Sequence, residues 1–163
     1  MAATQPQHDL GALCRALEAR WHDDIPISAA MGITVAGFDG ARLELRAALA
    51  PNVNVHGSAF AGSLFSLASL CGWGLLHLQL QCRGLSGSIV FVEGSIRCLK
   101  PVRDDVGAAC EWTTAAAAAL EALASSRRGR FALTTRLRCA GDLAAEFSGE
   151  YAVRLAAPTP APQ

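Results

Sequence analysis

NVNVHGSAFAGSLFSLASLCGWGLLHLQLQC, which runs from Asn52 to Cys82, contains no Asp, Glu, Lys or Arg. From about residue 59 to residue 81 its apolar residues recur almost all the way round a helix, so we expect one buried helix roughly 30 Å long. The stretch also exceeds the roughly 20 apolar residues that a membrane-spanning helix requires. Its serines, two glutamines and His77 suit lipid poorly, and strand-like patterns flank it. We therefore expect a helix buried by a sheet and no membrane span.

Glycines interrupt this helix at Gly62, Gly72 and Gly74. Each costs about 1 kcal/mol of helix propensity relative to alanine. We expect close approach of the helix backbone to a neighbouring element to compensate.

Alternating apolar and polar residues predict strands on both sides of the helix. Asp39-Gly40 separates two short alternating runs and predicts a β-hairpin. After the helix, the same pattern predicts strands at about 88–99, 106–113, 130–139 and 146–155. Residues 115–126 are rich in alanine, and their periodicity does not distinguish a helix from a strand.

An amphipathic helix is expected ahead of the hairpin, with Asp9 as its N-cap and Pro26 beyond its end. Its apolar face comprises Leu10, Leu13, Cys14, Leu17 and Trp21. With 163 residues the chain is long enough for one domain, which we place at 9–155. Residues 1–8 are expected to be a flexible N-terminus, and the proline- and alanine-rich tail 156–163 is expected to be disordered.

The balance of charge argues against nucleic acid as a partner. The chain has 14 basic and 14 acidic residues, so no basic surplus would neutralise a phosphate backbone. Six widely spaced cysteines form no C-x-x-C pair and mostly fall inside apolar segments, so we expect them to be reduced and buried. The polar, charged N-terminal region lacks the apolar segment of a signal peptide, so the expected location is the cytoplasm.

The element order defines an α+β fold: a helix, two strands, one long buried helix, then about four antiparallel strands. One curved antiparallel sheet wrapped around a single apolar helix satisfies this order, because each strand has one dry face. A single sheet leaves part of the helix uncovered. A second copy of the chain would cover it, so we expect a homodimer or a dimer of dimers.

This order is similar to the hotdog fold of acyl-CoA thioesterases and dehydratases. Two local sequences sharpen the resemblance: residues 50–76, from Ala50-Pro51-Asn52 through Phe60-Ala61-Gly62 to Cys71-Gly72-Trp73-Gly74, and the strand end Cys98-Leu99-Lys100-Pro101-Val102. The first resembles the thioesterase family named for the YiiD C-terminal domain. The resemblance spans roughly residues 25–155 and implies an oligomeric hotdog protein that hydrolyses an acyl thioester.

Thioester hydrolysis requires a polarised carbonyl and a positioned water. Backbone N–H groups of Phe60, Ala61 and Gly62 begin the long helix, where its dipole favours a developing oxyanion. Asn54 is a candidate for orienting the water or binding the carbonyl, and His56 is a candidate general base. The alternatives are that Ser58 merely caps the helix and that the asparagines shape the loop, an assignment we favour for Asn52.

No Asp or Glu occurs in the long helix, so this element supplies no carboxylate nucleophile or base. His56-Gly57 resembles the His-Gly-Gly turn of phenylacetyl-CoA thioesterases, which place an acid near the position of Phe65 or Ser66. Ser66 is therefore the candidate for holding the water. Glu93, predicted on the same strand face as Ile89 and Phe91, is the nearest alternative acid. If that face is solvated, Glu93 is an ordinary surface charge, and this is the assignment that we favour.

Arg97 and Lys100, at the end of one predicted strand, are candidates for binding the phosphates of a CoA or pantetheine-carrier thioester. The four histidines lack ligand spacing with one another or with cysteine, so no metal site is expected. No cofactor is expected either, since the CoA or carrier moiety belongs to the substrate.

The leading hypothesis is an acyl-CoA or acyl-carrier thioesterase with an acyl tunnel beside the long helix. A non-catalytic module that binds an acyl thioester is the first alternative, suggested by the missing helix carboxylate. A hotdog dehydratase or hydratase ranks lower, because no acid accompanies His56.

Overall fold

The computed structural model describes residues 9–157. The expected flexible segment 1–8 and most of the expected disordered tail, 158–163, lie outside the described residues.

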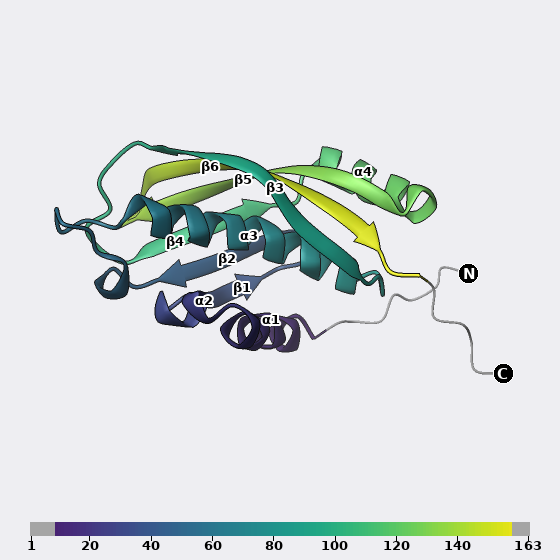
Figure 1. Cartoon of the computed structure of the whole chain (residues 1–163), viewed down its shortest axis with the longest axis horizontal. Helices are drawn as coiled ribbons and strands as arrows, with labels where there is room; N and C mark the ends of the chain where they lie inside the picture. Colours follow the sequence, from purple (N-terminus) through teal and green to yellow (C-terminus); the bar gives the residue numbers. More distant parts are fainter. Residues whose placement is uncertain (1–8, 158–163) are drawn as a thin grey trace.

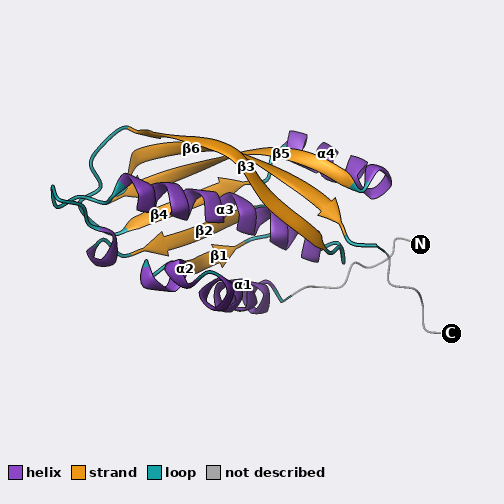
Figure 2. Ribbon diagram, in the orientation of Figure 1, coloured by secondary structure: helices purple, strands orange, loops and turns teal. Residues whose placement is uncertain are grey.

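Six strands form one antiparallel sheet that curves around a single long helix, α3 (Ala61–Gln81), as Figures 1 and 2 show. The order across the sheet is β1-β2-β4-β5-β6-β3, so β1 and β3 are its edges. The strands are β1 (Thr34–Phe38), β2 (Arg42–Ala47), β3 (Gly87–Cys98), β4 (Val106–Glu111), β5 (Arg128–Cys139) and β6 (Asp142–Leu155). The other helices are α1 (Leu10–Asp24), α2 (Pro26–Ala30) and α4 (Thr114–Ser126). This arrangement confirms the predicted curved sheet, the central helix and the extra N-terminal helix.

Hydrogen bonds from the sheet hold α3 in place. The Tyr151 hydroxyl of β6 donates to the Ser69 carbonyl at 2.9 Å, and the Thr135 hydroxyl of β5 donates to the Ala68 carbonyl at 3.2 Å. By length and composition α3 is apolar enough to cross a membrane, and half of its most apolar stretch is buried within the chain. The sheet therefore serves as the apolar surroundings of much of this helix.

Two of the three α3 glycines lie where the helix backbone meets another element. A Cβ atom at Gly72 would lie 2.3 Å from the Tyr151 hydroxyl oxygen, and one at Gly74 would lie 2.7 Å from the Trp21 ring of α1. Both distances are well inside van der Waals contact, which confirms the predicted close approach. Gly62 differs, because the nearest atoms to its added Cβ belong to the ring of Phe60, two residues earlier.

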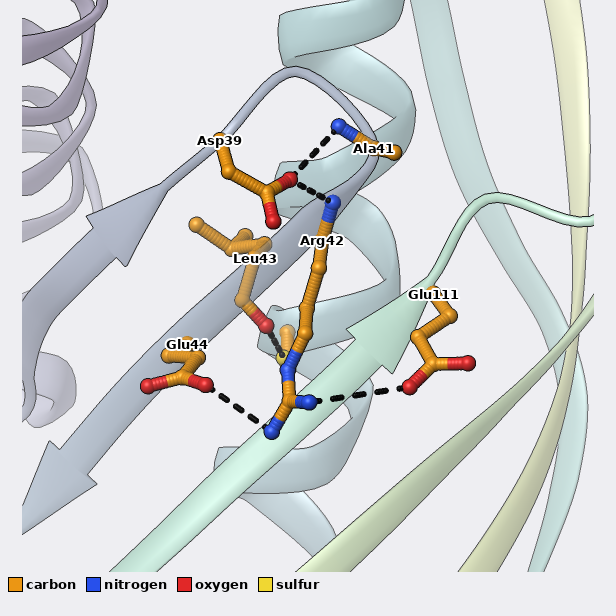
Figure 3. A network of polar contacts seen from close by, with 7 residues as sticks. Asp39, Ala41, Arg42, Leu43, Glu44 and Glu111 are labelled. Carbon is orange, nitrogen blue, oxygen red and sulfur yellow. Dashed lines mark hydrogen bonds and ion pairs between the residues drawn. The ribbon is translucent and has the colours of Figure 1, made fainter.

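The hairpin between β1 and β2 is built on its aspartate (Figure 3). Asp39 accepts hydrogen bonds from the backbone N–H groups of Ala41 and Arg42, at 2.8 and 2.7 Å, and these bonds lower the pKa of its carboxyl. Arg42 then pairs with Glu44 at 2.8 Å and with Glu111 of β4 at 3.7 Å. This network confirms the predicted Asp-Gly turn and joins it to the next strand of the sheet.

The alanine-rich segment forms α4, which packs against β5. Thr113 caps its start, accepting from the Ala116 N–H at 3.1 Å, and Leu120 and Leu123 are buried. Arg127, in a left-handed conformation with φ 56°, ends it. Periodicity could not distinguish a helix from a strand in this segment. The Thr113 cap and the two buried leucines identify it as a helix.

A β-bulge divides β3 into two registers. Phe91 lies opposite Tyr151 of β6, but Glu93 lies opposite Glu150, so Val92 is the extra residue. Because one extra residue reverses the alternation of side chains, Glu93 points to the outer face of the sheet. The prediction that Glu93 shares a face with Ile89 and Phe91 is wrong for this reason, and Glu93 is an exposed surface charge.

One side of the structure presents an open edge. β3 pairs with β6 only, and Val90, Phe91 and Val92 of β3 are exposed. Beside it, half-buried side chains recur along α3 every three or four residues: Ser63, Ser66, Leu70, Trp73 and His77. We call this surface, comprising β3 and the α3 stripe, the open side.

His77, at the far end of the stripe, makes stability depend on pH. Its ring stacks on Trp73 with centroids 5.1 Å apart, and burial, followed by the nearby Arg20 charge, lowers its pKa from 6.5 to about 4. His77 is therefore protonated near pH 6.5 in the unfolded chain but only near pH 4 in the folded chain. The free energy of unfolding should fall as the pH drops from about 6.5 to about 4.

His77→Phe, which retains an aromatic ring, should reduce this loss of stability between pH 7 and pH 5, as measured by urea unfolding. Identical pH dependence in both proteins would contradict the assignment.

Candidate functional site

A pocket of about 350 Å³ lies where the start of α3, the preceding loop and the end of β3 meet. It is lined by Asn54, Ser58, Ala59, Ala61, Leu64, Cys98, Leu99, Lys100, Pro101 and Val102. Three larger hollows lie elsewhere: two of about 520 Å³ on the outer face of the sheet between β3, β6 and β5, and one of about 550 Å³ beside β1, β2 and β4. We select the smaller pocket, because it alone of these four contains a helix N-terminus.

The N-terminus of α3 carries no side-chain cap. Phe60 is the N-cap residue and makes no capping bond, and within residues 9–157 no acceptor meets the N–H groups of Ala61, Gly62 or Ser63. The Phe60 N–H is not part of this set, because it donates to the Asn52 carbonyl at 2.7 Å. Ala61, which lines the pocket, therefore offers a free N–H at the positive end of the helix dipole.

Two asparagines shape the loop before α3. Asn52 is buried, and its side-chain nitrogen donates to the carbonyls of Met31 and Ala48 at 2.8 and 2.7 Å. Asn54 donates to the Ser58 hydroxyl and accepts from the His56 N–H at 2.8 Å. Asn52 thus has the structural role expected of it, whereas Asn54 lines the pocket with its amide already engaged in the loop.

These bonds also explain why Ser58 leaves the helix uncapped. Its hydroxyl and backbone N–H both point to Asn54, at 3.4 and 3.3 Å from the Asn54 side-chain oxygen. Gly57, with φ 69°, provides the reversal that brings Ser58 back to Asn54. The loop consequently folds on itself and leaves the first N–H groups of the helix available.

Two predicted catalytic residues, His56 and Ser66, and the predicted substrate-binding residue Phe60 lie outside the pocket lining. His56 is exposed on the loop, and its backbone is held by Asn54 and by Arg103, whose guanidinium donates to the His56 carbonyl at 3.5 Å. Ser66 lies one turn further along α3 and donates to the Gly62 carbonyl at 2.9 Å. Phe60 is 56% exposed, and its ring covers the Cα of Gly62. The Phe60 ring therefore occupies the position that a side chain at residue 62 would take.

The two predicted phosphate-binding residues differ in position. Lys100 lines the pocket, and its ammonium pairs with Asp142 at 2.8 Å. This hydrogen-bonded cation lowers the pKa of the Asp142 carboxyl. Arg97 lies opposite Glu146 on the outer face of the sheet, away from the pocket lining. Only Lys100 is placed to meet a ligand in the pocket.

Cys98 is a pocket residue that the sequence did not single out. The prediction that the cysteines are buried holds only for Cys71 and Cys110, whereas Cys98 is exposed. Burial raises the pKa of the Cys110 thiol to about 11. The bulge in β3 turns Cys98 inward, and no sequence signal located that bulge. Within residues 9–157, no three His, Cys, Asp or Glu side chains gather in a way that would hold a metal ion.

The family profile described as "Putative thioesterase (yiiD_Cterm)" matches residues 14–155. Among solved structures, a "putative thioesterase" from Shewanella oneidensis is 35% identical, with a TM-score of 0.83 over 90% of this chain and 99% of that chain. A Chlorobaculum tepidum protein of unknown function is 26% identical, with a TM-score of 0.84 over 89% and 96%. A thioesterase from Haemophilus influenzae is 15% identical, with a TM-score of 0.67 over 93% and 94%, and shares the fold.

Proposed function

Since this chain belongs to the thioesterase family named for the YiiD C-terminal domain, we propose that it hydrolyses an acyl thioester carried by coenzyme A or by a carrier protein. The observation that carries the proposal is the uncapped N-terminus of α3 inside a pocket. Free backbone N–H groups at a positive helix end suit a developing oxyanion.

In the proposed reaction, the thioester carbonyl oxygen accepts hydrogen bonds from Ala61 and its helical neighbour Gly62. Water adds to the carbonyl carbon, and the N–H groups stabilise the negative charge that forms on the oxygen. His56 accepts the proton that the water loses. The tetrahedral intermediate then collapses, the C–S bond breaks, the protonated His56 returns its proton to the departing sulfur, and the thiol and the carboxylic acid leave.

We assign roles to two further predicted residues from their contacts. Asn54 positions the loop, since its amide is engaged with Ser58 and His56. Ser66, whose hydroxyl donates to the Gly62 carbonyl, retains its oxygen as an acceptor on the open side. There it would hold the attacking water within its own subunit or for a partner copy.

The direct test is release of free thiol from a panel of acyl-CoA substrates. We expect turnover, and we expect a non-hydrolysable acyl-CoA thioether to slow the alkylation of Cys98 by iodoacetamide, because Cys98 lines the same pocket. Cys98→Ser identifies the protected site. Absence of thiol release from every substrate would reject the hydrolase.

Lys100 should contribute to recognition of the phosphates. Lys100→Gln should raise KM for acyl-CoA by about fivefold, equivalent to about 1 kcal/mol for an exposed ion pair. N-acetylcysteamine thioesters carry no phosphate and should be unaffected. Arg97→Gln is the matched control, because Arg97 faces away from the pocket, and it should leave both values unchanged. An equal rise in KM for both substrate types would contradict the role of Lys100.

We also propose that the open side pairs with a second copy of the chain. An edge strand of 12 residues with exposed Val90, Phe91 and Val92 lies beside a half-buried helix stripe, and a two-fold related copy would cover both. Sedimentation equilibrium should give twice the mass of the chain, or four times for a dimer of dimers. A monomer at micromolar concentration would overturn this proposal.

One observation favours a second function, binding without cleavage. No Asp or Glu lines the pocket, so no carboxylate is placed to activate a water. A protein of this kind would be stabilised thermally by acyl-CoA and would release no thiol. The same substrate panel, with melting temperatures recorded beside thiol release, separates the two functions.

A further inference from the structure

Four aromatic rings meet on the inner face of the sheet beside the open edge. Phe65 of α3 lies 5.0 Å from Phe147 of β6 and 5.9 Å from Phe91 of β3, between ring centroids. Phe91 lies 6.2 Å from Phe147 and 5.6 Å from Tyr151. These separations are typical of attractive aromatic contacts, so the rings form one packed cluster.

Glycines let these rings lie directly on the backbone of the sheet. A Cβ atom at Gly94 would lie 2.7 Å from the Phe147 ring, and one at Gly149 would lie 2.6 Å from it. The rings therefore fill the layer between α3 and the sheet at this point. No alkyl chain could pass beneath them without displacing a ring.

The cluster lies along the path that leads away from the pocket. α3 and β3 run side by side in opposite directions: Ala61 and Cys98 share the pocket, and further along the Trp73 indole donates to the Ile89 carbonyl at 3.1 Å. Phe65 is one helical turn, about 6 Å, beyond Ala61. Phe91 lies on β3 between Cys98 and Ile89. An acyl chain that ran from the pocket between α3 and β3 would meet Phe65 and Phe91.

The two sides of the cluster differ in burial. Phe147 is fully buried, whereas Phe91 is 36% exposed and Phe65 is half-buried. Phe91 and Phe65 therefore lie at the surface between α3 and β3, and Phe147 and Tyr151 support them from the sheet.

We propose that Phe65 and Phe91 form an aromatic stop that restricts the acyl group to short chains. This inference rests on the proposed thioester substrate and adds the length of its acyl chain. With the carbonyl at the N-terminus of α3, one helical turn is available before the rings, which accommodates a short aliphatic acyl group and excludes a long fatty chain.

The test measures kcat/KM for acyl-CoA substrates from acetyl to palmitoyl. The wild type should prefer short chains. Phe91→Ala should raise kcat/KM for long chains by about tenfold or more, the effect expected when two further methylene groups of the acyl chain become buried. Acetyl-CoA hydrolysis should change little. Phe91→Leu should give an intermediate profile and serves as the second variant if Phe91→Ala melts early. Val90→Ala, on the outer face of the same strand, should keep the wild-type profile.

Equilibrium binding of S-alkyl-CoA thioethers of graded length provides a readout without turnover. If the wild type cleaves no substrate but Phe91→Ala binds longer thioethers than the wild type, the aromatic stop is supported and the hydrolase activity is rejected. If the wild type cleaves short chains and Phe91→Ala has the same chain-length profile, the aromatic stop is rejected and the hydrolase activity is supported. Equal use of butyryl- and palmitoyl-CoA by the wild type also overturns the stop, as does a lack of all thioether binding.

Discussion

Ala61→Pro should lower kcat for thioester hydrolysis by about 100- to 1000-fold, the cost of about 2.7–4 kcal/mol that removal of one oxyanion donor incurs. Proline lacks a backbone N–H, whereas Ala61 lines the pocket and its N–H meets no acceptor within residues 9–157. The fold should tolerate the change. Ala61 is the first residue of α3, where proline is favoured, and Phe60 before it has φ −65° and ψ 131°, as a residue preceding proline prefers.

The matched control is Ala61→Gly, which keeps the N–H and should retain most of the activity. Circular dichroism and the melting temperature of Ala61→Pro should remain close to those of the wild type. A proline variant that is folded and fully active would exclude the Ala61 N–H from the reaction. A fall in both variants would instead point to the side chain or to loop geometry.

Gly72→Ala should lower the free energy of unfolding by about 1–3 kcal/mol, the usual cost of overpacking a core. Alanine gains roughly 1 kcal/mol of helix propensity over glycine, so the steric cost must exceed that gain. The added Cβ would lie 2.3 Å from the Tyr151 hydroxyl oxygen and would displace the hydrogen bond from Tyr151 to the Ser69 carbonyl. Urea unfolding of the two proteins measures the difference.

Gly37→Ala is the control, because nothing lies within 4 Å of its added Cβ. A double-mutant cycle with Tyr151→Phe adds a second check, since removing the hydroxyl removes the nearest obstacle. The coupling energy should lie in the range of about 0.5–3 kcal/mol found for residues in contact. Strict additivity of Gly72→Ala and Tyr151→Phe would show that the hydroxyl is not the source of the strain.

The architecture was predictable because its determinants are periodic. The uncharged stretch identified α3, and alternation located the long strands to within a few residues. α4 was not predictable from periodicity, because alanine side chains look alike on every face. Its determinants are single residues, the Thr113 cap and the left-handed Arg127. The helix α2 was not predicted, because its five residues are too few to show a periodic pattern.

The site was less predictable than the fold, since it depends on hydrogen bonds that a pattern does not specify. The sequence located the helix N-terminus and suggested Ser58 as its cap. The structure assigns Ser58 to Asn54 instead, through a turn at Gly57. Likewise, the sequence grouped Arg97 with Lys100, but strand geometry puts them on different surfaces. Such assignments require backbone angles at individual residues, and periodicity describes only their average.

The single extra residue in β3 imposes a constraint on how this protein can evolve. Phe91 reaches the aromatic cluster from one side of the bulge, while Cys98 reaches the pocket from the other side. Regular alternation through all 12 residues, with no bulge, would place Ile96 and Cys98 on the outer face whenever Phe91 faces inward. Substitutions along β3 change one contact each, whereas loss of the bulge without loss of a residue would turn over half of the strand. Homologues should therefore vary in residue type along this strand and either keep the bulge or lack the one residue that it accommodates.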